Sequence, residues 1–152
     1  MKLSDEPMRF GRCILAGLFT GIITAVIISI FNVIYRGHTN LIEYAIVMWI
    51  SIFTFFPFIN LIAGGFYFLF VTHLRKGQLL FILVTILGTI LCVLLTAFAG
   101  NFNDNNAVNV EKFRGLLIGL ELIEGIMAAA TIPYFANHPT IYLTDNDIRG
   151  EE

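Results

Sequence analysis

The chain has 152 residues, of which 57% are apolar, 14% aromatic and only 13% charged, and its mean hydropathy is +0.82. Soluble domains carry about 45–50% apolar and about 25% charged residues, so this composition excludes a disordered chain, a nucleic-acid binder with a basic surface and a disulfide-linked secreted module. The formal net charge of −2 is too small to indicate a partner, and the length is that of one compact unit.

The first apolar segment, residues 13–36, contains an uncharged run from Cys13 to Tyr35. About 20 such residues are needed to cross a bilayer as a helix. The many β-branched residues of this run would favour a strand in water, but a lone strand in lipid would leave its backbone groups without hydrogen bonds, so we expect a helix. Residues 1–12 mix acidic and basic side chains, and we expect a cytoplasmic segment there rather than a cleavable signal peptide.

The second apolar segment, residues 43–74, is longer than one perpendicular crossing requires and contains Pro57 near its middle. A proline inside a helix removes a backbone hydrogen bond and bends the helix. We therefore predict one long, tilted helix that is kinked at Pro57. The alternative is a short interfacial or re-entrant piece before Pro57.

The third and fourth predicted spans cover residues 78–100 and 113–136. The fourth is unusual because it is apolar except for Arg114 at its start and Glu121 and Glu124 inside it. The remaining residues, 137–152, are expected to be an acidic cytoplasmic tail. The predicted fold is thus an all-α, four-helix transmembrane bundle over residues 13–136.

The distribution of basic residues predicts the orientation of this bundle. With four crossings, both termini and the turn near Gly77 lie on the same side of the membrane. That side holds six basic residues and the opposite side three: Lys2, Arg9, Arg12, Arg75, Lys76 and Arg149 against Arg36, Lys112 and Arg114. The excess of positive charge places both termini in the cytoplasm.

Small residues recur at close to four-residue spacing in three of the predicted spans. Because lipid tails are as apolar as leucine, helices associate in membranes through close contact between such small residues. The residues expected to pack in this way are Gly17, Gly21 and Ala25, then Gly88, then Gly115, Gly119 and Gly125. Their partner helices belong to this chain, to a second copy or to another membrane subunit. Asn32 and Asn60 are expected to form hydrogen bonds between helices, each contributing about 0.6–2 kcal/mol.

Glu121 and Glu124 are three residues apart and therefore share one face of the fourth span, close to mid-bilayer. Inserting two central carboxylates costs about 5–7 kcal/mol, whereas the ten Leu, Ile and Phe residues of this span contribute only about 3–6 kcal/mol. The span should therefore depend on the other helices, with both glutamates facing inward. Three roles are open: a proton or cation site, hydrogen bonds to Asn60 or to the hydroxyl of a threonine or of Tyr67 that hold the bundle, or pairing with a basic residue of another subunit.

Other chemistry finds little support in the sequence. The Glu-x-x-Glu spacing is half of a carboxylate metal site, but the matching Glu-x-x-His is absent, so we expect no metal and no cofactor. Nucleophile–base pairs and phosphate-binding glycine loops are also absent, which argues against an enzyme. We expect a non-enzymatic membrane protein with a structural or accessory-subunit role, forming a homo-oligomer or joining other membrane subunits. The alternative is a small transporter or channel that uses Glu121 and Glu124.

A set of generic elements is spread over most of the chain: Arg12, Gly17, Gly21, Asn32, Pro57, Gly115, Gly119 and Gly125. In this layout the chain resembles uncharacterised families of small four-helix bacterial membrane proteins. The resemblance implies a multi-pass protein of the bacterial inner membrane. It implies no activity, and Glu121 and Glu124 match nothing in it.

Overall fold

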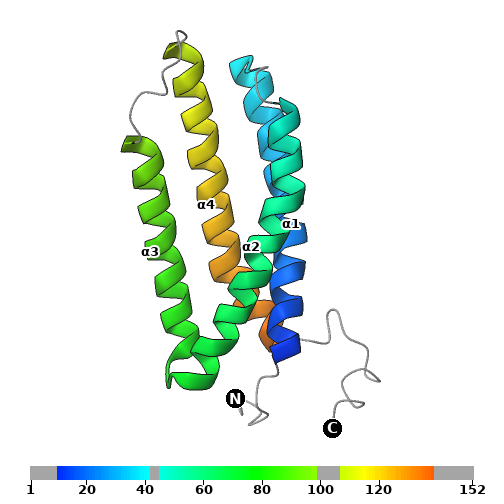
Figure 1. Cartoon of the computed structure of the whole chain (residues 1–152), viewed down its shortest axis with the longest axis vertical. Coiled ribbons are helices and arrows are strands. Elements are labelled where there is room, and N and C mark those ends of the chain that lie inside the picture. The colour runs from blue at the N-terminus through cyan, green and yellow to red at the C-terminus, as the bar shows by residue number, and fades with distance from the viewer. Residues whose placement is uncertain (1–9, 42–44, 99–106, 139–152) are drawn as a thin grey trace.

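The computed structural model describes residues 10–41, 45–98 and 107–138, which form four α-helices. They are α1 (Phe10–Thr39), α2 (Ala45–His73), α3 (Gly77–Phe98) and α4 (Ala107–Asn137), and consecutive helices run in opposite directions (Figure 1). The start of α1, the α2–α3 turn and the end of α4 meet at one end, the lower end in Figure 1. The predicted all-α four-helix bundle is confirmed.

Each of the four helices is long and apolar enough to cross a membrane, over Phe10–Thr39, Met48–His73, Gly77–Phe98 and Val110–Asn137. The chain is therefore a multi-pass membrane protein. α1 starts before and ends after the predicted span 13–36, and α4 starts well before residue 113. Such extensions are expected where a helix continues from the hydrocarbon into the headgroup region.

Pro57 lies inside α2, and the helix continues through it from Ala45 to His73. The segment before Pro57 is thus part of the same helix rather than a separate re-entrant piece. Because proline has no N–H, the carbonyl of Phe53 lacks its usual helical donor, which is the condition for a bend. α2 slants across α1 towards the lower end of α3 (Figure 1).

Local sequence explains why α1 stops. Asn40 has a φ of 54°, a left-handed conformation that asparagine tolerates better than most residues. The N–H of Leu41 then donates to the carbonyl of Arg36 at 3.3 Å, the pattern of a Schellman cap. The Arg36 side chain also donates to the Leu41 carbonyl at 2.9 Å, and Leu41 is buried against the bundle.

The turn between α2 and α3 depends on Gly77, whose N–H donates to the Leu74 carbonyl at 3.0 Å. A Cβ at position 77 would collide with the backbone of Phe70 and Val71. The first turn of α3 therefore lies directly on the last turns of α2. The Phe81 ring follows, edge-on to Tyr67 at 5.1 Å between centroids.

The buried residues form two apolar clusters, one above the other along the bundle axis. The lower cluster consists of Cys13, Ala16, Tyr67, Phe81, Ala128, Ile132 and Ala136. The upper cluster consists of Ala25, Ile28, Leu41, Met48, Ile52, Leu116 and Leu120. Between them along α1, α2 and α4 lie polar residues, which we call the central polar layer: Thr20, Thr24, Asn60 and Glu124.

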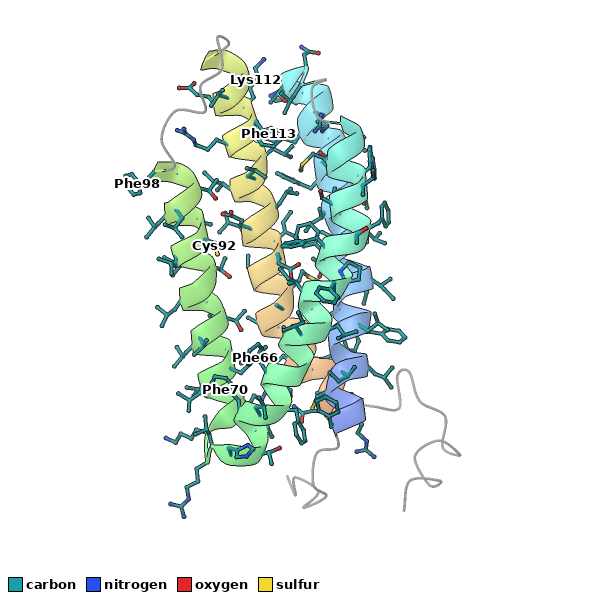
Figure 2. All side chains as sticks on the ribbon, viewed as in Figure 1. Phe66, Phe70, Cys92, Phe98, Lys112 and Phe113 are labelled. Atoms are coloured by element: carbon teal, nitrogen blue, oxygen red, sulfur yellow. The ribbon has the colours of Figure 1, made fainter. Side chains whose placement is uncertain are left out.

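Helix α3 is packed differently from the other three. Its buried residues are Gly77 and Phe81, both at its lower end. Above them α3 lies beside α4 and diverges from α2 (Figure 1). Phe98 at its upper end points away from the bundle and is 81% exposed (Figure 2). Most of the α3 surface is therefore left for lipid or for another protein.

Candidate functional site

The two glutamates of α4 reach different neighbouring helices. Glu121 and Glu124 both lie in the middle third of the span Val110–Asn137, and both side chains are half-buried. Glu124 contacts α2 and Glu121 contacts α3. Glu121 and Glu124 lie one turn apart on α4, as their spacing predicts, but their carboxyl groups have separate partners.

Glu124 is bonded to the amide of Asn60. The Asn60 Nδ2 donates to Glu124 Oε1 at 2.5 Å and also to the carbonyl of Phe56 at 3.0 Å. Both hydrogens of the amide are thereby used, and the Asn60 side chain is completely buried. Asn60 therefore forms the interhelical bond that the sequence suggests for it, and its partner is an acidic residue.

The surroundings of Asn60 fix its position. A Cβ at Gly17 would collide with the Asn60 backbone carbonyl, and a Cβ at Gly21 would come within 3.1 Å of Asn60 Cβ. α1 and α2 thus approach each other closely where the glycines of one meet Asn60 and Gly64 of the other. From this close contact the Asn60 side chain reaches Glu124 of α4.

Glu121 is bonded to Thr96 of α3, whose hydroxyl donates to Glu121 Oε1 at 2.5 Å. This bond lies in the upper part of the bundle, where α3 has no buried residue. Two turns lower, the side chain of Thr89 lies against Gly125 so closely that a Cβ on the glycine would overlap it. These two contacts connect the otherwise exposed α3 to α4.

Each carboxyl group also has a second oxygen that is buried without a bond. Glu121 Oε2 and Glu124 Oε2 have no hydrogen-bond partner among the described residues, and neither has Asn60 Oδ1 or Thr24 Oγ1. Buried polar atoms normally find a partner. Of these four atoms, three belong to the central polar layer.

The remaining member of the layer links α1 to α4. The hydroxyls of Thr20 and Thr131 lie 2.8 Å apart, within hydrogen-bond distance, and the Thr131 hydroxyl also lies 2.7 Å from the carbonyl of Met127. Thr20 is completely buried. α4 is therefore bonded through side chains to α1, α2 and α3.

The small residues predicted to pack between helices have different surroundings. Gly17 and Gly21 lie against α2, as described, and Ala25 is buried in the upper cluster. Gly115 and Gly119 of α4 lie against the rings of Tyr35 and Phe31 of α1, and Gly125 lies against α3. Gly88 of α3 is exposed, with no atom within 4 Å of where its Cβ would be.

Asn32 departs from the expectation of a bond between helices. Its Oδ1 accepts a hydrogen bond from Arg36 Nε at 2.8 Å, four residues further along the same helix. Its Nδ2 is buried without a partner among the described residues. The reason is local: residues four apart on a helix are neighbours, and the arginine occupies the amide oxygen.

Asn60 is among the partners expected for the two glutamates, and it bonds Glu124. The bond from Thr96 to Glu121 depends on how α3 is rotated against α4, which the sequence does not specify. The sequence likewise does not distinguish Thr20 and Thr131, which bond each other, from the other threonines of the spans. The one indication in the sequence is that each of these threonines is a hydroxyl-bearing residue within an otherwise apolar helix.

The described residues contain no group of three His, Cys, Asp or Glu side chains placed to hold a metal ion. Two shallow depressions on the outer surface are lined by mainly apolar residues of α1 and α2, and neither includes a glutamate. The comparisons with family models, with curated proteins and with solved structures found no match. The case for function therefore rests on the geometry of this chain.

Proposed function

We propose that the chain is a non-enzymatic component of a membrane assembly, either a homo-oligomer or an accessory subunit. The observation that supports this most directly is that Glu121 and Glu124 each bond a different helix through a neutral donor. Bonds of this kind contribute about 0.6–2 kcal/mol each inside a membrane. In this role the glutamates tie α2 and α3 to α4, and they act on the fold rather than on a substrate.

The state of α3 supports the assembly part of the proposal. Its buried residues are confined to one end, while Gly88 and Cys92 in its middle are exposed. Elsewhere in the described chain, glycines at the same kind of spacing allow helices to approach closely. The exposed small residues of α3 would allow a helix of another chain to approach it as closely.

Native mass spectrometry of the purified protein in lipid nanodiscs tests the homo-oligomer. We expect a complex of more than one copy, and we expect Gly88→Leu to dissociate it because the bulky side chain fills the exposed face of α3. The matched control is Ala130→Leu, which adds the same bulk at an exposed position of α4 and should leave the complex intact. A complex that survives both changes would rule out α3 as the interface.

The accessory-subunit form is tested by copurification from native membranes. A second membrane protein should be retained in fixed stoichiometry by the wild type and lost with Gly88→Leu. A chain that is monomeric in nanodiscs and copurifies with nothing would refute the assembly role.

A second candidate function is transport or conduction of a proton or cation, and one observation favours it. The second oxygens of Glu121 and Glu124 are buried without bonds among the described residues, and intramembrane acids without cationic partners often bind ions. Flux into liposomes should then be measured for the wild type and for Glu121→Gln with Glu124→Gln. Flux that is lost in the double variant supports transport, and no flux from either protein refutes it.

A further inference from the structure

We propose that Glu124 is a proton-binding site in the centre of the bundle, positioned by Asn60 on α2. The inference deepens the second candidate function but requires no net transport, and it is independent of the assembly role. It begins from the central polar layer, which interrupts the apolar core between the lower and upper clusters. Asn60 lies near the middle of the span Met48–His73, and Glu124 near the middle of Val110–Asn137. The layer therefore lies where water is scarcest.

The first step concerns the charges near Glu124. Residues 14–34 of α1 and 49–66 of α2 include no ionisable side chain, and the only one on α3 is the exposed Cys92. On α4 itself, Glu121 lies one turn away and is also acidic. The groups that face Glu124 from all its neighbours thus supply no positive charge, and two carboxylates one turn apart repel each other.

The second step counts hydrogen-bond donors in the layer. Both hydrogens of the Asn60 amide are used, one on Glu124 Oε1 and one on the Phe56 carbonyl. The oxygens left without a partner among the described residues are Glu124 Oε2, Asn60 Oδ1 and Thr24 Oγ1. Of these, only the threonine hydroxyl can donate. A proton on Glu124 Oε2 adds the missing donor and removes an uncompensated buried charge.

The third step distinguishes a proton from a metal cation. Cations such as calcium require about six to eight oxygen ligands and space for the ion. The unbonded oxygens of the layer are buried by protein atoms, and the described residues contain no group of three His, Cys, Asp or Glu side chains that could hold a metal ion. A proton needs no cavity. The site therefore fits H⁺ better than any metal ion.

The fourth step connects the proton to the backbone of α2. An ionised carboxylate accepts a stronger hydrogen bond than a neutral carboxyl group does. Release of the proton would strengthen the bond from Asn60, whose amide also holds the carbonyl of Phe56, the residue before Pro57. Asn60 is thus a positioning residue that couples the charge on Glu124 to the part of α2 where helical bonding is already interrupted.

Infrared spectroscopy of the protein in nanodiscs tests the proposal, since a neutral carboxyl group absorbs separately from a carboxylate. At neutral pH we expect the wild type to show a neutral-carboxyl band. The band should disappear in Glu124→Gln and persist in Glu111→Gln, a control that removes an exposed carboxylate at the start of α4. It should also persist in Glu121→Gln. A wild type without the band, or a band that survives Glu124→Gln, would overturn the inference.

Asn60→Ala supplies a second readout that does not depend on Glu124→Gln folding. Because a hydrogen bond to a carbonyl lowers its stretching frequency, loss of the Asn60 donor should move the band to higher frequency while leaving its intensity. A band at the unchanged frequency would mean that Asn60 does not position this carboxyl group. A neutral-carboxyl band in a protein that conducts no protons would refute transport and leave the proton site intact.

Discussion

Glycines in two parts of this bundle have opposite surroundings. Where α1 crosses α2, Gly17 and Gly64 lie against the backbone of the facing helix, so that even one methyl group would not fit. On α3, Gly88 faces open space. A glycine in an apolar helix therefore does not by itself indicate a close contact. Whether the contact exists depends on the helix that faces it.

The difference extends to what holds each helix. α1, α2 and α4 share both apolar clusters and the central polar layer. α3 contributes only Phe81 to the lower cluster, and above it α3 is connected by Thr89 against Gly125 and by the bond from Thr96 to Glu121. α3 should therefore be the helix most easily displaced. The following substitutions test this contrast, from the largest expected effect to the smallest.

Gly17→Ala should have the largest effect, because its Cβ would collide with the backbone carbonyl of Asn60 and rigid backbone cannot move aside. Overpacking of this kind costs about 1–3 kcal/mol, occasionally more. Thermal unfolding in detergent, followed by circular dichroism, should show a clear loss of stability. Unchanged unfolding would mean that α1 and α2 do not approach each other as described.

Gly125→Ala should have an intermediate effect. The atoms in its way belong to the Thr89 side chain on the loosely held α3, so the cost should lie near 1 kcal/mol, the lower end of the overpacking range. Adding Thr89→Ala removes the two nearest atoms and should recover part of the loss. If the double variant is less stable than Gly125→Ala alone, the two residues are not in contact.

Thr96→Val should have a smaller effect, since it removes one hydrogen bond to Glu121 without changing the shape of the side chain much. The expected loss is about 0.6 kcal/mol, in line with interhelical bonds in membranes. A double-mutant cycle with Glu121→Leu, which leaves no acceptor oxygen for the Thr96 hydroxyl, should show coupling between the two positions. Strict additivity would show that the bond does not contribute.

Gly88→Ala should have almost no effect on the stability of the isolated chain, within about 0.5 kcal/mol, because nothing lies near its Cβ position. It is the matched control for Gly17→Ala, with the same chemical change in a helix of the same bundle. The same unfolding measurement applies. A loss as large as that of Gly17→Ala would remove the contrast between the two helices.

The fold could be predicted from the sequence because it depends on only two properties of each segment, its length and its apolar composition. An apolar run of about 20 residues in lipid has to be a helix, and four such runs predict four helices, including the one that passes through Pro57. The inward position of Glu124 also followed from its insertion cost. These predictions require no knowledge of how the helices are rotated.

Asn60 apart, the individual contact partners could not be predicted, because they depend on rotation and register between helices. Gly17 and Gly88 look alike in the sequence, yet one is buried against backbone and the other is exposed. Thr96 was not distinguishable as the partner of Glu121. Asn32 is a different case, since Arg36 four residues later is a local competitor that the spacing alone reveals.

The central claim is that α4 crosses the bilayer with its glutamates turned towards the other helices. Spin labels at Leu122 and Ile126, both exposed on the outer side of α4, test it in vesicles of a Cys13→Ala, Cys92→Ala background. We predict strong relaxation by oxygen, which dissolves in lipid, and little by a water-soluble nickel chelate. Ready access of the nickel chelate to Ile126 would contradict the account.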